Sequence, residues 1–235
     1  MMIALTGTKS GLVSTRVIRL TLVLALAAAC SHKPEVPKLD KMTPGVFLEG
    51  EPLSEGVRAL LRALPDDGLA LTEDSEGFVP TLYDDSANYC SIAFGHLVKK
   101  SGCDGTEPGE FLRGVSRERG GALLKTDMGR AQQAVSSSVT VTLNNGQYGA
   151  LCDFVYNVGS GNFRGSTLLK VINAKNFDSI PPQLRRWTMA GGVRQPGLVK
   201  RREREIDLFF QGTKPPSRGL EEALPPIDVQ VGEQG

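Results

Sequence analysis

The sequence predicts an α+β protein in which a small β-sheet lobe precedes a mainly helical lobe. Two observations support this prediction. Residues 81–95 alternate in polarity and contain turn residues, which is typical of a β-hairpin or a small three-stranded sheet. From residue 116 onward the apolar residues recur with the helical period instead. The chain of 235 residues is long enough for one domain with a hydrophobic core.

Two short helices are predicted ahead of the sheet. The first covers residues 53–64 and ends at a turn that contains Pro65 and Gly68. The second covers residues 69–77 and carries Glu76 near its end. The predicted sheet therefore begins directly after a helix end that bears a carboxylate.

The helices of the second lobe each have a start signal. Ser116, Asn144 and Ser166 are of the residue types that cap helix N-termini, and Pro181 and Pro196 are suited to a first helical turn. The last of these helices extends to residue 210. The apolar positions predicted to face the core are Leu123, Leu124, Met128, Ala131, Val135, Tyr148, Leu151, Cys152, Val155, Leu168, Leu169, Ile172, Leu198, Ile206 and Phe209.

The N-terminus has the composition of a secretion signal. Arg16 and Arg19 precede the apolar run 20–29, which is shorter than the ~20 residues that span a bilayer. Small residues directly before Cys30 resemble the lipobox of bacterial lipoproteins, in which the cysteine is lipidated, and by this resemblance Ser31 favours the outer membrane. The alternatives are an ordinary signal peptide in which Cys30 has no role, and an uncleaved anchor.

These patterns divide the chain into four parts. We expect a signal peptide at 1–29, a lipidated cysteine with a proline-containing linker at 30–52, and a folded domain at 53–212. The tail at 213–235 is rich in proline and is expected to be disordered. A net charge of +1 gives no basic surface of the kind that nucleic acids bind, so we expect no nucleic-acid partner.

The cysteines are interpreted in the light of the predicted export, which implies an oxidising compartment. Cys90 and Cys103 flank one loop, so a local disulfide is predicted, with reduced thiols as the alternative. Cys152 lies in a helical apolar pattern and is expected to be a small buried hydrophobe. His32 and His96 are the only histidines, and no cysteine–histidine spacing suggests zinc, so no metal or cofactor is predicted.

Two carboxylates and a hydroxyl stand at short spacing around the predicted sheet. Asp85 follows Glu76 by nine positions, and Ser91 follows Asp85 by six. Glycoside hydrolysis needs a carboxylic acid that protonates the leaving oxygen and a second carboxylate that activates water or attacks the sugar. Burial at the helix end would keep Glu76 protonated, whereas a polar hairpin favours a charged Asp85, against which Ser91 could orient water. The alternative is solvated surface charge.

Several separated motifs resemble those of the phage-type lysozymes, the muramidases of glycoside hydrolase family 24. The resemblance covers roughly residues 65–212. The first motif is Glu76-Gly77-Phe78, followed by Tyr83, Asp85 and Ser91-Ile92-Ala93-Phe94-Gly95-His96. The others, in the order of the family, are residues 143–159, Phe163-Arg164-Gly165-Ser166-Thr167-Leu168-Leu169, Trp187, Ala190-Gly191-Gly192 and Pro196-Gly197-Leu198-Val199-Lys200-Arg201-Arg202.

This resemblance implies a two-lobed lysozyme-like fold and a monomeric enzyme that acts on peptidoglycan. The bond cleaved would be the β-1,4 linkage between N-acetylmuramic acid and N-acetylglucosamine. By the same resemblance Glu76 is the general acid, Asp85 is the base or electrostatic partner, and Ser91 is the equivalent of a catalytic threonine. Inversion is the outcome in the family, with water entering opposite the leaving group.

Two positions depart from the family pattern. Ser91 replaces threonine, which keeps the hydroxyl but loses the methyl group that restricts χ1, so we expect lower activity rather than none. Ala93 replaces glycine, and it is strained if that position requires a positive φ.

Other side chains near the site have a structural and a functional interpretation. Tyr83 and Asn157 are candidates for substrate binding, with hairpin packing and a helix C-terminal cap as the alternatives. His96 is expected to hold the hairpin to the helices through a hydrogen bond or ion pair. Trp187 is expected in the core.

The final helix has a basic cluster that is predicted to be available on its outer side. It consists of Lys200, Arg201, Arg202 and Arg204. Arg201 and Arg202 could pair with Glu76 or Asp74, and an exposed basic helix face is the alternative.

Two other functions compete with an envelope-anchored muramidase. A lipoprotein that binds peptidoglycan with little or no cleavage is favoured by Ser91 and Ala93, whereas the intact pair of Glu76 and Asp85 argues against it. A lytic transglycosylase would use a single acid and leave an anhydro sugar.

Overall fold

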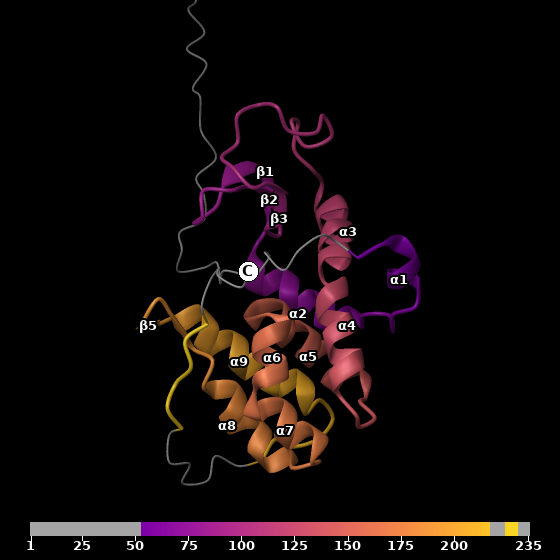
Figure 1. Ribbon diagram of the computed structural model, residues 1–235, viewed down its shortest axis with the longest axis vertical. Helices are drawn as coiled ribbons and strands as arrows, with labels where there is room; N and C mark the ends of the chain where they lie inside the picture. The colour runs from indigo at the N-terminus through magenta and orange to yellow at the C-terminus, as the bar shows by residue number, and fades with distance from the viewer. Residues whose placement is uncertain (1–52, 217–223, 230–235) are drawn as a thin grey trace, which may run out of the picture. The chain divides into compact units, whose positions relative to one another are not determined.

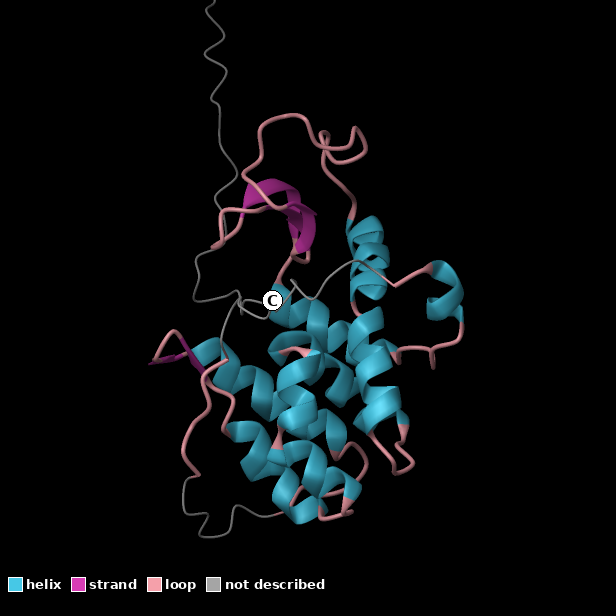
Figure 2. Ribbon diagram, viewed as in Figure 1, coloured by secondary structure: helices cyan, strands magenta, loops and turns pink. Residues whose placement is uncertain are grey.

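The structure is a computed structural model that describes residues 53–216 and 224–229 (Figure 1). It confirms the predicted α+β class: a small antiparallel sheet is followed by a larger group of helices (Figure 2). Within these residues no helix is long and apolar enough to cross a membrane. The predictions for the signal sequence, Cys30 and the linker lie outside the described residues.

The predicted sheet has three strands in the order β1-β2-β3. They are β1 (Val79–Asp84), β2 (Cys90–Ala93) and β3 (His96–Lys99). Tyr83 in β1 is paired with Ser91 in β2, so the turn between these strands carries Asp85. All four residues of β2 are buried, because this central strand lies against the helices as well as between its neighbours.

The two helices ahead of the sheet differ from the prediction at their ends. α1 (Glu55–Ala59) covers only part of the predicted 53–64, and none of its residues is buried. Short helices depend on packing an apolar face, and α1 has none to pack. α2 (Asp66–Glu76) begins three residues before its predicted start, because the two aspartates of its first turn favour the positive end of the helix dipole.

The segment after Ser116 forms two helices where one was predicted. Ser116 caps α3 (Arg117–Asp127) as expected, and its hydroxyl accepts the N–H of Arg119 at 3.2 Å. Met128 is fully buried, ends α3 and directly precedes α4 (Gly129–Ser138). The helical period continues through this break, so the sequence pattern does not reveal it.

Apart from α6, which was not predicted, the remaining α-helices begin close to their predicted start signals. Asn144 and Gln147 form a reciprocal capping box at the start of α5, and Ser166 caps α7. The elements are α5 (Asn145–Val158), α6 (Ser160–Gly165), α7 (Thr167–Asn173), a 3₁₀ turn (Phe177–Ser179), α8 (Ile180–Arg185) and α9 (Pro196–Phe209).

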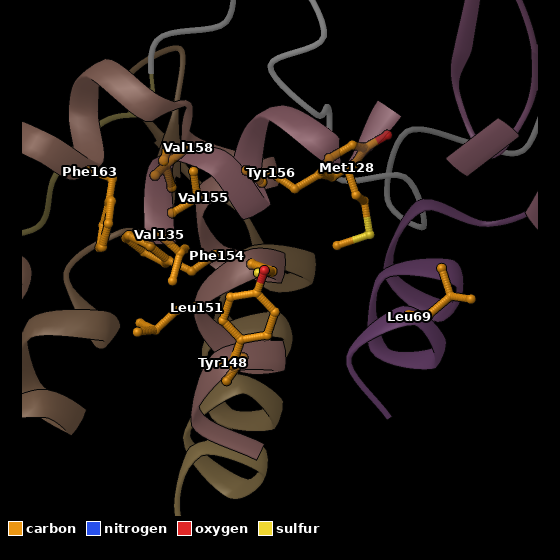
Figure 3. Close-up of a cluster of buried hydrophobic side chains, with 14 of the residues drawn as sticks. Leu69, Met128, Val135, Tyr148, Leu151, Phe154, Val155, Tyr156, Val158 and Phe163 are labelled. Atoms are coloured by element: carbon orange, nitrogen blue, oxygen red, sulfur yellow. The ribbon is translucent and has the colours of Figure 1, made fainter. Parts of the chain in front are cut away.

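The core is built around α5, which packs against α2, α4 and α9. Nearly every α5 residue after its first turn is buried, and Figure 3 shows Phe163 and Val135 on one side of its apolar side chains and Met128 on the other. Trp187 is buried as predicted, with its ring edge-on to Phe154 at 5.5 Å between centroids. α5 is thus the scaffold on which the other helices are placed.

Glycines allow α2 and α9 to approach the α5 backbone closely. A Cβ built on Gly68 of α2 would lie 2.7 Å from Gly149 Cα, and one built on Gly149 would lie 3.0 Å from Gly68 Cα. A Cβ on Gly146 would lie 2.5 Å from the Leu208 carbonyl oxygen of α9. The separation of the three helices is therefore fixed by backbone contact.

A small hairpin precedes α9, formed by β4 (Met189–Ala190) and β5 (Val193–Arg194). A segment from near the end of the chain packs along it. Asp228 bridges to Met189 in parallel, and its carboxylate accepts the N–H groups of Gly191 and Gly192 at 3.1 and 2.6 Å.

The prediction of disorder in the tail is wrong for residues 224–229. Val229 is buried, and Ile227 packs against the core cluster. These two apolar side chains flank Asp228 in the alternating pattern of a strand, which the high proline content of the tail obscures.

Gly68→Ala is expected to lower the free energy of unfolding by about 1–3 kcal/mol, because the added methyl group meets the α5 backbone. Gly56→Ala is the matched control in α1, where no heavy atom lies within 4 Å of a built Cβ. There alanine should be neutral or slightly stabilising. Urea unfolding of both variants measures the difference, and equal effects would contradict the close approach of α2 and α5.

Candidate active site

Glu76 is the last residue of α2, where Gly77 ends the helix with φ 75°. Its side chain turns into the helical lobe rather than toward solvent, and only 3% of the residue is exposed. The predicted burial of this carboxyl at a helix end is therefore confirmed.

The nearest charged partner of Glu76 is Arg201 on α9. Arg201 Nη1 donates to Glu76 Oε1 at 2.7 Å, and the guanidinium is buried. Arg201 also donates from Nε and Nη2 to the two carboxylate oxygens of Asp153 on α5, at 3.0 and 2.7 Å. One guanidinium thus joins α2, α5 and α9.

A second buried ion pair lies next to the first. Arg202 Nη2 is 2.8 Å from Glu205 Oε1 and donates to Asn157 Oδ1 at 2.7 Å, while its guanidinium lies over the Phe154 ring. Asp153 also accepts the hydroxyl of Thr72 at 2.8 Å.

The prediction that Arg201 and Arg202 lie on the outer side of α9 is wrong. Both are buried, Arg201 pairs with Glu76 as one alternative proposed, and Asp74 pairs with Arg204 instead. The buried face of α9 has the expected helical period, but charged residues occupy part of it.

Asp153 and Glu205 were not identified from the sequence, although both are fully buried. A signal was present. Asp153 interrupts the apolar run 150–155, and Glu205 stands one helical turn after the adjacent arginines 201 and 202. Acidic residues at core positions, with basic residues at core positions of another helix, indicate a buried network.

Burial raises the pKa of Glu76 to about 7, against an opposing effect of the Arg201 charge and hydrogen bond. The position of Glu76 at the negative end of the α2 dipole acts in the same direction as burial. Burial, together with the charges of Glu76 and Asp85, also raises the pKa of Tyr83. Near neutral pH Glu76 can therefore hold a proton and donate it.

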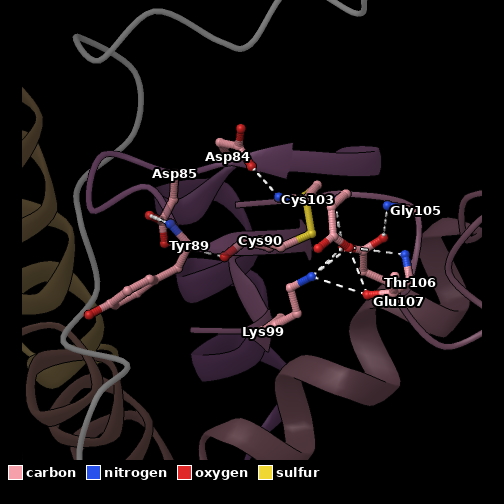
Figure 4. Close-up of a disulfide and its surroundings, with 11 residues drawn as sticks. Asp84, Asp85, Tyr89, Cys90, Lys99, Cys103, Gly105, Thr106 and Glu107 are labelled. Carbon is pink, nitrogen blue, oxygen red and sulfur yellow. Dashed lines mark hydrogen bonds and ion pairs between the residues drawn. A yellow bond between two sulfur atoms is a disulfide. The ribbon is translucent and has the colours of Figure 1, made fainter. Parts of the chain in front are cut away.

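Asp85 is held in a different environment, at the turn between β1 and β2. Its Oδ1 accepts the backbone N–H groups of Ala87 and Tyr89 at 2.8 and 2.9 Å. Figure 4 shows the contact with Tyr89. Asp85 Oδ2 accepts the hydroxyl of Ser91 at 3.3 Å. The carboxylate is only half-buried. Backbone N–H groups fix one of its oxygens, and the other faces the Ser91 hydroxyl, with which it can share a water molecule.

Ala93 has φ 61°, so the position that is glycine in the family pattern does require a left-handed backbone. An alanine there is strained by about 1–2 kcal/mol. Its Cβ is fully buried and lies 3.0 Å from the position that a Cβ on Gly120 would take. The strain falls in β2, two residues after Ser91.

The predicted disulfide between Cys90 and Cys103 is present (Figure 4). It connects β2, immediately before Ser91, to the loop after β3. Asp84 accepts the Cys103 N–H at 2.7 Å, and Lys99 contacts Asp104 at 2.6 Å. The strand that carries Ser91 is thus tied to its surroundings covalently as well as by hydrogen bonds.

Three further side chains in or near the site have structural roles. His96 Nδ1 is 2.9 Å from Asp127 Oδ2 and so connects β3 to the end of α3, as predicted. Asn157 is fully buried and holds Arg202, which differs from both the sugar contact and the helix cap considered for it. Cys152 is buried and is a free thiol.

One group of metal-ligating residue types occurs within the described ranges, namely Cys90, Cys103 and Glu107. The two sulfur atoms are bonded to each other, and Glu107 accepts the backbone N–H groups of Asp104 and Gly105. This group therefore offers no thiolate ligands.

Known proteins match the part of the chain that contains these residues. The sequence profile of the family described as phage lysozyme matches residues 73–205. The endolysin of Salmonella phage P22 is 34% identical over 148 residues, 63% of this chain and 97% of that protein. The SAR-endolysin of bacteriophage PS119 is 37% identical over 130 residues, 55% of this chain and 73% of that protein. A crystal structure of a P22 lysozyme variant has a TM-score of 0.56 at 32% identity and covers 63% of this chain and 99% of that one.

Glu76→Gln is expected to stabilise the protein increasingly as pH rises. The pKa of Glu76 is about 7 in the folded state against an ordinary 4.5, so the folded state keeps a proton that the unfolded state loses in this window. The wild type should therefore lose on the order of 3 kcal/mol of stability relative to the variant between these pKa values.

Denaturant unfolding of wild type and Glu76→Gln at about pH 4 and at pH ~8 checks this expectation. Asp74→Asn is the control, since it removes an exposed carboxylate from the same helix. A difference between wild type and Glu76→Gln that does not change with pH would show that Glu76 has no raised pKa.

Proposed function

The chain belongs to the phage lysozyme family and is a lysozyme that hydrolyses peptidoglycan, and we propose that Glu76, Asp85 and Ser91 carry the reaction. The single observation that best supports this assignment is the contrast between the two carboxyls. Glu76 is buried and protonated near neutral pH, while Asp85 is half-buried at a polar turn. Glycoside hydrolysis requires such a division between an acid and a base.

In the proposed reaction Glu76 donates its proton to the glycosidic oxygen as the bond from that oxygen to C1 of N-acetylmuramic acid breaks. The departing N-acetylglucosamine leaves with a free 4-hydroxyl group. The adjacent Arg201 then stabilises the Glu76 carboxylate that remains, because Arg201 Nη1 already donates to Oε1. Solvent returns the proton after the product leaves.

Asp85 and Ser91 are proposed to hold the attacking water. The backbone N–H groups of the β1–β2 turn fix Asp85 Oδ1, and Ser91 contacts Oδ2. A water that donates to Asp85 and accepts from Ser91 would attack C1 opposite the leaving group, and its proton would pass to Asp85. This route gives inversion, the outcome in the family that the sequence resembles.

Tyr83 and Asn157 are proposed to support the site in different ways. Tyr83 lies close enough to both acids to be affected by their charges, which supports a place at the edge of the substrate site. Asn157 is buried, so we propose that it acts by holding Arg202 rather than by touching sugar.

We also propose that the enzyme is exported and is anchored by lipid at Cys30. The lipid would hold it at the outer membrane, as a monomer that faces peptidoglycan. The apolar run before Cys30 and the similarity to the SAR-endolysin of bacteriophage PS119 support export. The proline-containing linker at 30–52 would give the domain reach.

Glu76→Gln and Asp85→Asn are each expected to lower peptidoglycan hydrolysis by at least about a hundredfold, because each removes one proton-transfer group. Ser91→Ala should also lower it, whereas Ser91→Thr should equal or exceed wild type, since the added methyl group restricts χ1. The loss of turbidity of a purified peptidoglycan suspension gives the rates, with Asp74→Asn as the control. Full activity of Glu76→Gln would refute its assignment.

The products separate the proposed reaction from its alternatives. Hydrolysis yields a reducing N-acetylmuramic acid end, and inversion yields the α anomer first in NMR spectra of fresh product. Anhydro products in mass spectra would identify a lytic transglycosylase. Binding of peptidoglycan without any released fragments would identify a binding lipoprotein.

Cys30→Ala is expected to abolish incorporation of labelled palmitate when the full chain is produced in a Gram-negative host, because the variant lacks the sulfur that would carry the lipid. The wild type should be labelled and should fractionate with membranes. Peptidoglycan hydrolysis by the extracted variant is the control for folding. Equal labelling of variant and wild type would rule out the anchor.

A further inference from the structure

Arg201 has two acidic partners, and it does not divide its hydrogen bonds equally between them. Nε and Nη2 both donate to the Asp153 carboxylate, at 3.0 and 2.7 Å, and Nη2 also approaches the Asp153 backbone oxygen at 3.5 Å. Only Nη1 donates to Glu76, at 2.7 Å. The bidentate pair with Asp153 is the stronger arrangement, because both N–H groups point along one carboxylate.

This asymmetry bears on how Glu76 keeps its proton. A buried arginine with Glu76 as its only acidic partner would strongly favour the charged carboxylate. The general acid would then lose its proton before the substrate binds. We propose that Asp153 is a positioning residue that neutralises Arg201, so that Arg201 orients Glu76 without removing its proton.

The charge on Asp153 is itself well supported. Burial acts to raise its pKa, but the charge and hydrogen bonds of Arg201 outweigh burial and lower it. Thr72 contributes another donor to Oδ1 at 2.8 Å. Asp153 is therefore a fixed negative charge at the pH values at which Glu76 exchanges its proton.

The other groups that face Glu76 do not replace this effect. Those close enough to influence it electrostatically are Arg201 and Arg202 from α9, Asp153 and Tyr156 from α5, and Tyr83 from β1. The tyrosines are neutral, since burial raises both of their pKa values. Asp153 is thus the one negative charge that acts on Glu76 from within this group.

Glu205 completes the charge balance of the network. Burial raises its pKa, and its Oε1 lies 2.8 Å from Arg202 Nη2. Glu205 is therefore the acidic partner of Arg202, as Asp153 is the bidentate acidic partner of Arg201.

The inference deepens the proposed function and rests on Glu76 as the general acid. Its test is the pH profile of kcat/KM, measured from initial rates at low concentrations of purified peptidoglycan. The alkaline limb of this profile reports the pKa of the acid in the free enzyme. Asp153→Asn is expected to move that limb to lower pH by about one unit, which is a tenfold loss of rate above the limb.

Asp74→Asn is the matched control, because it also removes an aspartate from an ion pair with an α9 arginine, but at the surface. Its limb should coincide with that of wild type. If the alkaline limb of Asp153→Asn stays in place or moves to higher pH, the proposal is overturned. This holds even if the variant loses activity uniformly at every pH.

If circular dichroism shows that Asp153→Asn does not fold, Thr72→Val provides the test. It removes only the hydroxyl that donates to Asp153, so the carboxylate acts more strongly on its surroundings, and the limb should move to higher pH by about a few tenths of a unit. No movement, or movement to lower pH, would contradict the proposal.

The outcome for Glu76→Gln separates this inference from the proposed function. An inactive Glu76→Gln together with an unshifted Asp153→Asn limb would leave Glu76 as the acid and refute only the role of Asp153. A fully active Glu76→Gln would refute the role of Glu76 itself.

Discussion

The buried guanidinium of Arg201 is the constraint on which the arrangement of the helical lobe depends. It joins Glu76 at the end of α2 to Asp153 within α5, and it is carried by α9. A buried charge that loses its partner costs about 3–5 kcal/mol, so the three helices must meet at distances that let these groups pair. The glycines at the α2–α5 and α5–α9 contacts permit that approach. Apolar packing around α5 and the ion network therefore fix the same geometry.

The two lobes give the two proposed catalytic carboxyls opposite environments. The helical lobe takes Glu76 out of water and raises its pKa to about 7. The sheet lobe leaves Asp85 half-buried and occupies one of its oxygens with backbone N–H groups. The contact of His96 with Asp127 holds the sheet next to α3, and the disulfide of Cys90 and Cys103 ties β2 to the loop after β3. Protonation of the leaving oxygen and activation of water can then take place at the same pH.

Sequence patterns predicted the sheet and most helix starts correctly, because caps and alternation are local signals. Motif spacing singled out the three residues that are proposed to be catalytic, and their roles stay predictions. The predictions failed where the structure depends on a contact between residues that are far apart in the sequence. Arg201 was predicted on the outer side of α9, with a pair to Glu76 as one alternative, because its chemistry is that of a surface residue. Its burial is accompanied by acids on two other helices, Glu76 on α2 and Asp153 on α5. The strand around Asp228 was missed because its partner lies in a hairpin far along the chain. Strain at Ala93 was predicted only if the position required a positive φ, because an alanine in a sequence does not indicate a left-handed backbone.

The central claim is that the fold keeps a protonated carboxylic acid at the end of α2. Carbon-13 NMR of protein with labelled glutamate side chains measures this directly, with Glu76→Gln identifying the Glu76 carboxyl signal. Titration should show the Glu76 carboxyl carbon changing shift with a midpoint near the pKa of about 7 that burial produces. A midpoint near the ordinary 4.5 would mean that Arg201 holds Glu76 as a carboxylate, and the account of this site would be wrong.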